Sequence, residues 1–311
     1  MSENQNDVAA LPPRPARKKG PLIGLGVVLA AALVAVLVFT TSGGSGGDRV
    51  TVRIGTTDAS SPYWPTFKEI AAREGIDIVP VNFSDYTQPN PAVSQGQIDL
   101  NLFQHLLFLA NYNVSNNDSL VPVGSTFVVP LSLYSQKHAT VADIPAGGTV
   151  AIPNDPTNQA RALLVLQSAG LVKLNGGGSV LSTPAEIDAA ASKVSVTPVD
   201  AAQTVTALPS VDASIVNNNY ALNGGLDPSK ALFGDDPASP SAEPYINVIA
   251  TRAADRDNPV YQRVAQLYKD SAVVAQVQAE SKGTSVMVDR PRSDLDAILA
   301  RLSETVRAGR R

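Results

Sequence analysis

The 311-residue sequence contains no cysteine, which excludes disulfide frameworks, thiolate metal sites, thiol nucleophiles and lipid-modified cysteines. Histidine is nearly as scarce, because only His105 and His138 occur and their separation matches no known ligand spacing. We therefore expect no metal site. The length allows one large or two modest domains, so a sizeable core is available.

The familiar motifs of catalysis and phosphate binding are also missing. There is no Gly-x-Ser-x-Gly elbow, Walker loop, His-Glu-x-x-His or strand-linked Gly-x-Gly-x-x-Gly. Among candidate cleft residues only His105 suits acid–base chemistry, and the sequence identifies no partner for it. We predict that the chain is not an enzyme and needs no cofactor. An enzyme on the same scaffold is a rival hypothesis, which a search for products would test.

Positive charge is scarce beyond the N-terminal arm. The whole chain has 24 basic and 28 acidic residues, a net charge of −4. Residues 1–46 hold four of those basic groups and two of the acids, so the remainder carries a net charge of −6. A chain with this balance repels nucleic acid, and no nucleic-acid partner is expected.

The N-terminal region predicts a membrane anchor. Residues 1–20 are polar and end in a basic cluster, which indicates a cytoplasmic tail. The 21 residues of 21–41 carry no charge and, at ~1.5 Å per residue, suffice to cross a ~30 Å hydrocarbon layer. A cleaved signal peptide is the alternative, but the apolar run is too long for one and lacks a clean cleavage site. Residues 42–49 form a flexible linker. These features predict a single-pass protein of the cell membrane with an extracytoplasmic binding region.

The remaining chain has the pattern of an α/β protein, in which short β-branched runs alternate with helical segments. Five or more such strands favour doubly wound sheets. The predicted strands begin with the alternation of Val50, Val52 and Ile54 and continue with Ile76–Val81, Ile98–Leu102, Thr149–Ile152, Val194–Thr197 and Ala213–Val216.

Three helices carry clear signals. Asp155, Pro156 and Gly170 suit the N-cap, the first turn and the C-cap of a helix over 156–169. A capping box at 183–186 indicates the start of another. The apolar stripe within 295–306 predicts an amphipathic helix that packs on a core.

Polar residues near the start of the helix over 156–169 form a candidate anion site. Asn158 and Arg161 lie three residues apart, on one face of the first turns and close to the free N–H groups. A guanidinium binds a carboxylate through two parallel hydrogen bonds, and Asn158 can donate and accept. A surface arginine is the alternative interpretation.

Aromatic residues near two strand ends predict a wall of the same site. Tyr86 follows a strand in a turn-rich run, and Phe103, His105 and Phe108 lie where a strand passes into a helix. Such rings suit an apolar or thioether side chain. His105 has the alternative of a structural hydrogen-bonding role. Asp85 and Asn90 lie in the same turn-rich run as Tyr86, and an equally good interpretation is that they only stabilise this loop.

Three consecutive amides follow the strand over 213–216. Burying them without partners would be costly, so Asn217, the first of them, is expected to face a cleft.

These segments resemble the NlpA/MetQ family, the substrate-binding components of methionine-type ABC importers. The resemblance covers roughly Val50 to Gly283 and is carried by FSDYTQPN, IDLNLFQH, the LYS of 133–135, IPNDPTNQARALLVLQSAGLVKL, NNNYA and PYINVIATR. The PNDPTN segment followed by an arginine is a specific signature.

The resemblance implies a two-lobed periplasmic-binding-protein fold of type II, in which two α/β lobes close on a ligand. Residues 50–130 and 246–311 would form lobe 1, and 131–245 lobe 2. It also implies an importer permease with its ATPase as partners, and methionine as the first candidate ligand. The implied binding residues are Tyr86, Phe103, His105 and Phe108 for the ligand side chain, Asn158, Arg161 and Asn217 for its amino-acid backbone, and Tyr134 as a weaker candidate.

Three features depart from the family pattern. The lipid-bearing cysteine is absent, and the predicted span would replace it as a tether. Tyr63 and Trp64 occupy a place where small or polar residues are usual, so Trp64 either narrows the pocket or packs in a core. Nearly thirty residues follow Gly283. Two alternatives to methionine binding stay open. The ligand could be a methionine derivative, a dipeptide or a different amino acid, or the chain could be an interaction module with no role in transport.

Overall fold

The computed structural model describes residues 49–310, which fold around two five-stranded sheets. The first sheet has the strand order β2-β1-β3-β11-β4 and the second the order β10-β6-β9-β7-β8. The strands of the first sheet are β1 (Val50–Thr56), β2 (Ile76–Asn82), β3 (Leu100–His105), β4 (Val121–Ser125) and β11 (Asn247–Thr251). Those of the second are β6 (Ser132–Tyr134), β7 (Gly148–Pro153), β8 (Val194–Val199), β9 (Ala213–Val216) and β10 (Phe233–Gly234).

Each sheet combines parallel and antiparallel pairs. Strand β1 pairs in parallel with β2 and β3, and β7 pairs in parallel with β8 and β9. Strand β11 lies antiparallel between β3 and β4, and β6 lies antiparallel to β9. Strands β7 and β9 are buried along nearly their whole length, as expected for parallel strands covered on both faces, whereas the edge strands β2 and β8 also carry exposed residues. The predicted α/β class is confirmed.

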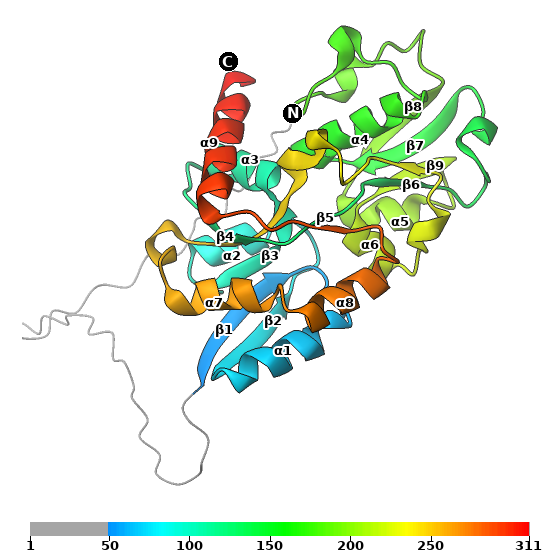
Figure 1. The fold of residues 1–311 in the computed structure, drawn as a ribbon. Coiled ribbons are helices and arrows are strands. Elements are labelled where there is room, and N and C mark those ends of the chain that lie inside the picture. Colours follow the sequence, from blue (N-terminus) through cyan, green and yellow to red (C-terminus); the bar gives the residue numbers. More distant parts are fainter. Residues whose placement is uncertain (1–48, 311) are drawn as a thin grey trace, which may run out of the picture. The chain divides into compact units, whose positions relative to one another are not determined.

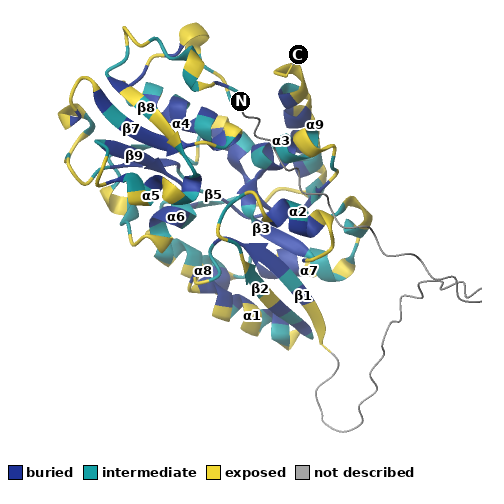
Figure 2. Cartoon of the chain, turned by 180° about the vertical axis from the view of Figure 1, so that it is seen from behind, coloured by how far each residue is buried: buried dark blue, intermediate teal, exposed yellow. Residues whose placement is uncertain are grey.

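Helices cover the sheets as Figure 1 shows. The helices are α1 (Tyr63–Arg73), α2 (Pro89–Ser94), α3 (Leu106–Asn116), α4 (Pro156–Ser168), α5 (Thr204–Ala207), α6 (Asn218–Asn223), α7 (Pro259–Leu267), α8 (Ser271–Glu280) and α9 (Arg292–Ala308). Figure 2 shows that strands β7 and β9 consist mainly of buried residues, as expected for strands covered on both faces.

The chain passes twice between the two sheets. The first crossover runs from β5 (Phe127–Val128) to β6, and the second runs from β10 to β11. After α8 the chain returns as β12 (Val286–Met287), which pairs with β5 beside the first crossover. The two sheets are therefore halves of a two-lobed architecture rather than parts of one continuous sheet.

Most elements lie where the sequence predicts them. Helix α4 has Asp155 as its N-cap, whose carboxylate accepts from the Asn158 N–H, and Gly170 follows with a φ of +72°. The capping box at Thr183 is present, but it opens a single 3-10 turn and no α-helix. Helix α9 buries the predicted stripe, which comprises Leu295, Ile298, Leu299, Leu302 and Val306, in a core shared with α3 and β11.

The predicted tail and span and nearly all of the predicted linker lie outside the described residues. Within residues 49–310, no helix combines the length and apolar composition that a membrane crossing requires.

Candidate ligand-binding site

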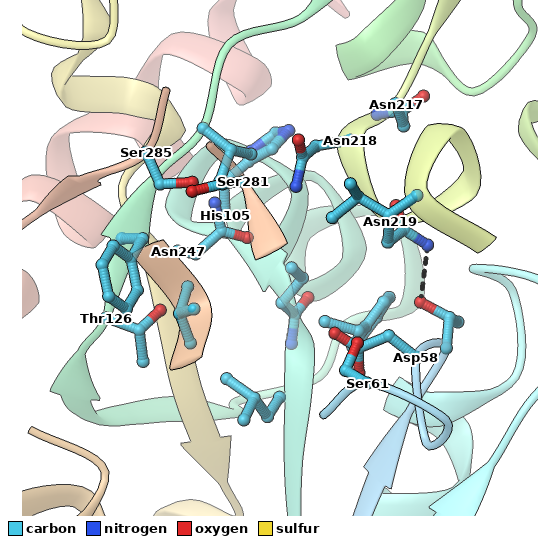
Figure 3. A pocket seen from close by; sticks show the side chains of 18 of the residues that line it. Asp58, Ser61, His105, Thr126, Asn217, Asn218, Asn219, Asn247, Ser281 and Ser285 are labelled. Atoms are coloured by element: carbon cyan, nitrogen blue, oxygen red, sulfur yellow. Dashed lines mark hydrogen bonds between the residues drawn. The ribbon is translucent and has the colours of Figure 1, made fainter. Parts of the chain in front are cut away.

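A cavity of about 120 Å³ lies between elements of the two sheets. Its lining comes from the ends of β1, β3 and β9, the first turns of α3, α4 and α6, and the segment from α8 to β12. Ligands of open α/β sheets bind at the carboxyl ends of the strands, where this cavity lies. Figure 3 shows Asn217, Asn218 and Asn219 along one side of the cavity, with Asp58 and Ser61 nearby.

The aromatic wall forms as predicted. The ring centroids of Tyr86 and Phe103 are 5.8 Å apart, those of Phe103 and Phe108 are 5.7 Å apart, and those of Tyr86 and Phe108 are 6.0 Å apart. These tilted and edge-on contacts are the arrangements that aromatic quadrupoles favour. All three rings line the cavity and offer an apolar surface to a ligand side chain.

His105 has a structural role at the corner between β3 and α3. It is the N-cap of α3, and its Nδ1 accepts a hydrogen bond from the Phe108 N–H at 3.0 Å. Because Nδ1 accepts, Nε2 carries the proton of the neutral ring and points to Asn158 Oδ1 at 3.4 Å. Burial, with a further contribution from the positive charge of Arg161, lowers the pKa of His105 to about 3. The imidazole is therefore neutral at physiological pH and already holds two partners.

Asn158 connects the two lobes. Its Nδ2 donates to both carboxylate oxygens of Asp155 at 3.0 Å, while its Oδ1 accepts from Asn217 Nδ2 at 3.0 Å and faces His105. Asn158 is only 2% exposed, and neighbouring side chains use its polar atoms. It positions Asn217 and His105, and a direct bond from Asn158 to a ligand would have to share these atoms.

Asn217 faces the cavity, as predicted. Its side chain is 9% exposed, and its Oδ1 is buried without a hydrogen-bond partner among the described residues. An unpaired buried amide oxygen costs on the order of 1–3 kcal/mol. A ligand N–H donor that reaches this oxygen would recover that cost.

Arg161 is buried at the cavity and not on the surface. Only 3% of it is exposed, and its guanidinium lies over the Tyr245 ring at 4.1 Å from the ring centroid. It forms a two-point ion pair with Asp235, through Nε to Oδ2 at 2.6 Å and Nη2 to Oδ1 at 3.0 Å. Nη2 also donates to the Val129 carbonyl at 2.8 Å.

The ion pair changes the predicted electrostatics of the site. The sequence suggests a free cation that waits for a carboxylate, but Asp235 already neutralises the guanidinium. Within residues 49–310, Nη1 is the nitrogen of Arg161 left without a hydrogen-bond partner. A ligand carboxylate could therefore accept hydrogen bonds from Nη1 of Arg161, but the charge of the guanidinium is already balanced by Asp235.

Several further contacts join the lobes around the cavity. Asn219 Nδ2 donates to Thr57 Oγ1 at 2.9 Å, and the Tyr86 hydroxyl donates to Asn219 Oδ1. Asn223 Nδ2 donates to the Thr57 carbonyl at 3.0 Å. The sequence signal for these contacts between the lobes was the run of three amides at 217–219, but a role was predicted only for Asn217.

Two predicted candidates lie elsewhere. Tyr134 is buried in β6, in a cluster with Val216 and Tyr220, and is not among the residues that line the cavity. Antiparallel pairing with β9 and β10 fixes the face on which its ring lies, and sequence spacing does not reveal that face. Trp64 packs in the core beside Phe67, so its alternative as a pocket wall is not realised. Its neighbour Tyr63 reaches the cavity instead.

The sequence interpretation missed other lining residues. Many of them are polar, and these include Asp58, Ser61, Gln104, Thr126, Asn247, Glu280, Ser281 and Ser285. Most belong to segments that meet only in the folded chain, such as β11 and the segment after α8.

The neutral state of His105 predicts a pH effect on stability. The folded-state pKa is about 3, whereas an unfolded histidine titrates near about 6.5. The unfolded chain therefore binds the extra proton between these values, so the stabilisation that is complete above the unfolded pKa is lost as pH falls. Between about pH 7 and about pH 5 we expect the free energy of unfolding to fall by about 2 kcal/mol more in wild type than in His105→Asn.

Chemical denaturation at the two pH values checks this prediction. Asparagine keeps an oxygen acceptor at the N-cap, so the variant retains the cap while losing the titrating ring. Parallel pH dependences of the two proteins would show that His105 is not held neutral by the fold.

Breaking the ion pair should destabilise the chain strongly. We expect Arg161→Ala to lower the free energy of unfolding by about 3–5 kcal/mol, because Asp235 would be left without its cation. The matched control is Arg73→Ala, which removes an exposed pair with Glu69 and should cost no more than about 1 kcal/mol. Equal shifts in the two denaturation curves would contradict the assignment.

The chain is similar to known proteins over most of its length. The sequence model of the NlpA lipoprotein family matches residues 52–288. The D-methionine-binding lipoprotein MetQ of Salmonella typhi is 34% identical over 247 residues, which cover 78% of this chain and 90% of that protein.

Solved structures give the same result. The substrate-binding protein of a methionine transporter from Streptococcus pneumoniae is 36% identical, with a TM-score of 0.71 over 76% of this chain and 95% of that one. A nutrient-binding protein from Burkholderia cenocepacia, solved bound to methionine, is 33% identical, with a TM-score of 0.70 over 76% of this chain and 99% of that one. The chain belongs to the NlpA lipoprotein family.

Proposed function

We propose that this chain is an extracytoplasmic solute-binding protein that captures a small amino acid, with methionine as the first candidate, and delivers it to an ABC importer. The permease and ATPase of that importer are the proposed partners. The family supports this role, and relatives are named for methionine binding and methionine transport.

The observation that carries the proposal is the pair of unused polar groups beside the aromatic wall. Arg161 Nη1 offers donors, and Asn217 Oδ1 offers a buried acceptor. A zwitterion supplies the complementary groups, because its carboxylate accepts from the guanidinium and its ammonium donates to the amide oxygen. His105 and Asn158 would fix the positions of these groups, and Asn247 adds an amide on the same cavity.

The aromatic wall is suited to the side chain of methionine. Burying a side chain of that size contributes about 1.5–3 kcal/mol, and contacts of sulfur with rings add about 0.3–1.5 kcal/mol. The polar contacts must provide the remainder of the binding free energy. One methylene changes binding by only about 1–3 kcal/mol in such a pocket, so close analogues should compete with methionine.

The proposed mechanism is closure of two lobes of a type II binding protein, with no covalent chemistry. Two hydrogen bonds support a closed arrangement, because they would break if the lobes separated: Asn219 Nδ2 donates to Thr57 Oγ1, and the Tyr86 hydroxyl donates to Asn219 Oδ1. A ligand stabilises such a state only through contacts that it makes there and not in the open form. Asn217 and Arg161 belong to lobe 2 elements, whereas Phe103 and Phe108 belong to lobe 1 elements. A ligand in the cavity could contact both sets at once only when the lobes are closed.

We also propose that residues 21–41 anchor the protein in the membrane as a single span, with residues 1–20 inside and 42–49 as the linker. The uncharged run and the preceding basic cluster support this topology. The absence of cysteine supports it further, since the chain has no cysteine to carry a lipid.

Titration calorimetry tests the proposed function. We expect methionine to bind the purified full-length chain, and Asn217→Ala to weaken binding about 10- to 100-fold because a hydrogen bond to a charged group is worth about 1.5–3 kcal/mol. The matched control is Asn116→Ala, which removes an exposed amide on α3 and should leave affinity unchanged.

Mass spectrometry of small molecules released by denaturing the purified protein identifies any ligand that it retains. A released amino acid or close derivative would support the proposal. A chain that binds no amino acid in calorimetry and releases none would contradict it.

A further inference from the structure

The C-terminal helix α9 lies beyond the part of the chain that the family model matches. That match ends at residue 288, and α9 runs from Arg292 to Ala308. Figure 1 shows α9 beside α3 of lobe 1, and the apolar stripe of α9 belongs to the same hydrophobic core as the buried leucines of α3. The helix is therefore an integral part of lobe 1.

The same helix also holds the second crossover between the lobes. The core that contains the stripe of α9 includes Ala242 and Tyr245, which lie in the crossover segment before β11. On the outer face of the helix, Arg301 forms an ion pair with Glu243 of that segment. Since the Arg161 guanidinium lies over the Tyr245 ring, the crossover that α9 supports is the one behind the ligand-binding cavity.

The end of α9 reaches lobe 2 as well. Val180 and Leu181 lie between α4 and β8, and both pack against the core that contains α9. Gly309 follows the last turn of α9, and a Cβ built on it would lie only 2.4 Å from Leu181 Cδ1. The leucine methyl group therefore lies directly against the backbone at the end of the helix. One helix contacts lobe 1, the second crossover and lobe 2.

Separation of the lobes would disturb the contact of Leu181 with α9 whichever way lobe 2 rotates. A rotation that moves Leu181 away from α9 exposes apolar surface to water, which is unfavourable. A rotation that moves Leu181 toward α9 presses its methyl group onto backbone atoms that it already touches, and close-packed groups resist further approach. The contact therefore favours the closed arrangement of the lobes.

We propose that α9 is a strap that holds the two lobes closed and thereby slows the release of the ligand. The proposal rests on the proposed function, because it concerns the lobe closure on which capture depends. A contact made in the closed form raises the population of that form, and the apparent affinity for a ligand rises with the fraction of chains that are closed. The strap touches no ligand, so it affects all ligands of the cavity alike.

Interlobe distances in the purified full-length chain test the strap without any ligand. Because the sequence has no cysteine, spin labels can be attached solely at Lys68→Cys on α1 and Thr197→Cys on β8, which are exposed positions on lobe 1 and lobe 2. We expect Leu181→Ala to increase the fraction of long distances between the labels. The matched control is Leu164→Ala, which removes a partly buried leucine that packs within lobe 2 and should leave the distances unchanged.

Methionine binding provides a second measurement on the same variants. Leu181→Ala should raise the Kd for methionine about 3- to 10-fold and speed dissociation, because a partly buried side chain loses a contact made in the closed form. The Kd for norleucine should rise by the same factor, since the strap does not touch the ligand. Leu164→Ala should lower the unfolding temperature and leave both Kd values unchanged.

A variant on the other side of the contact decides the question if Leu181→Ala does not fold. Gly309 has a φ of −71°, which alanine adopts readily, but the added methyl group would need the space that Leu181 Cδ1 occupies. We therefore expect Gly309→Ala to increase the fraction of long distances too. Added to Leu181→Ala, it should cause no further change, because that space is then empty.

The outcomes separate the strap from the proposed function. If neither variant changes the interlobe distances, or if the distances change while the Kd for methionine does not, the strap is overturned and the proposed function stands. If the distances change as expected but the wild-type chain binds no amino acid, the proposed function is overturned, whereas the control of lobe closure by α9 is supported.

Discussion

The buried ion pair between Arg161 and Asp235 joins the parts of the chain that form the cavity. Arg161 lies in α4, and its guanidinium holds the first crossover through the Val129 carbonyl and the second through Asp235. Asp235 in turn accepts from the Leu131 N–H at 2.8 Å. Burying a pair is less costly when its remaining donors and acceptors are satisfied, and here the crossover backbone supplies partners for Arg161 Nη2 and Asp235 Oδ1, while Nη1 stays available to a ligand. The geometry of the site therefore depends on this pair before any ligand arrives.

The pair also decides what kind of ligand the cavity can select. A free arginine would attract any anion, whereas a neutralised one offers only a shaped hydrogen-bonding edge. Selection then depends on a few unsatisfied groups, above all Asn217 Oδ1. Sites that hydrogen-bond a ligand reject an analogue without the matching group far better than apolar pockets reject a missing methylene. In the proposed function, the aromatic wall would set the size of the ligand side chain, and the polar groups would set the chemical class of the ligand.

Local sequence patterns predicted the elements that depend on local chemistry. Asp155, Pro156 and Gly170 specify the ends of α4 through capping and backbone preferences, and the strand over 213–216 was predicted with its observed bounds. The aromatic wall was predictable because the rings follow a turn or a strand end. The partner of Arg161 was not, since Asp235 lies 74 residues later and no periodicity relates the two positions.

Contacts that depend on tertiary pairing were missed for the same reason. Glu280 and Ser285 flank the end of α8 and reach the cavity only because the chain returns there to pair β12 with β5. Tyr134 was misplaced because the pairing of β6 determines which face of the strand its ring occupies. The sequence indicated that the amides at 217–219 needed partners, but it did not show that Asn219 bonds across the cleft to Thr57.

A crystal structure of the chain with methionine tests the central claim most directly. The account predicts that the Arg161–Asp235 pair persists, with the ligand carboxylate within hydrogen-bonding distance of Arg161 Nη1 and the ligand ammonium on Asn217 Oδ1. Methionine bound elsewhere, or an Arg161 that has left Asp235 to reach the ligand, would contradict it.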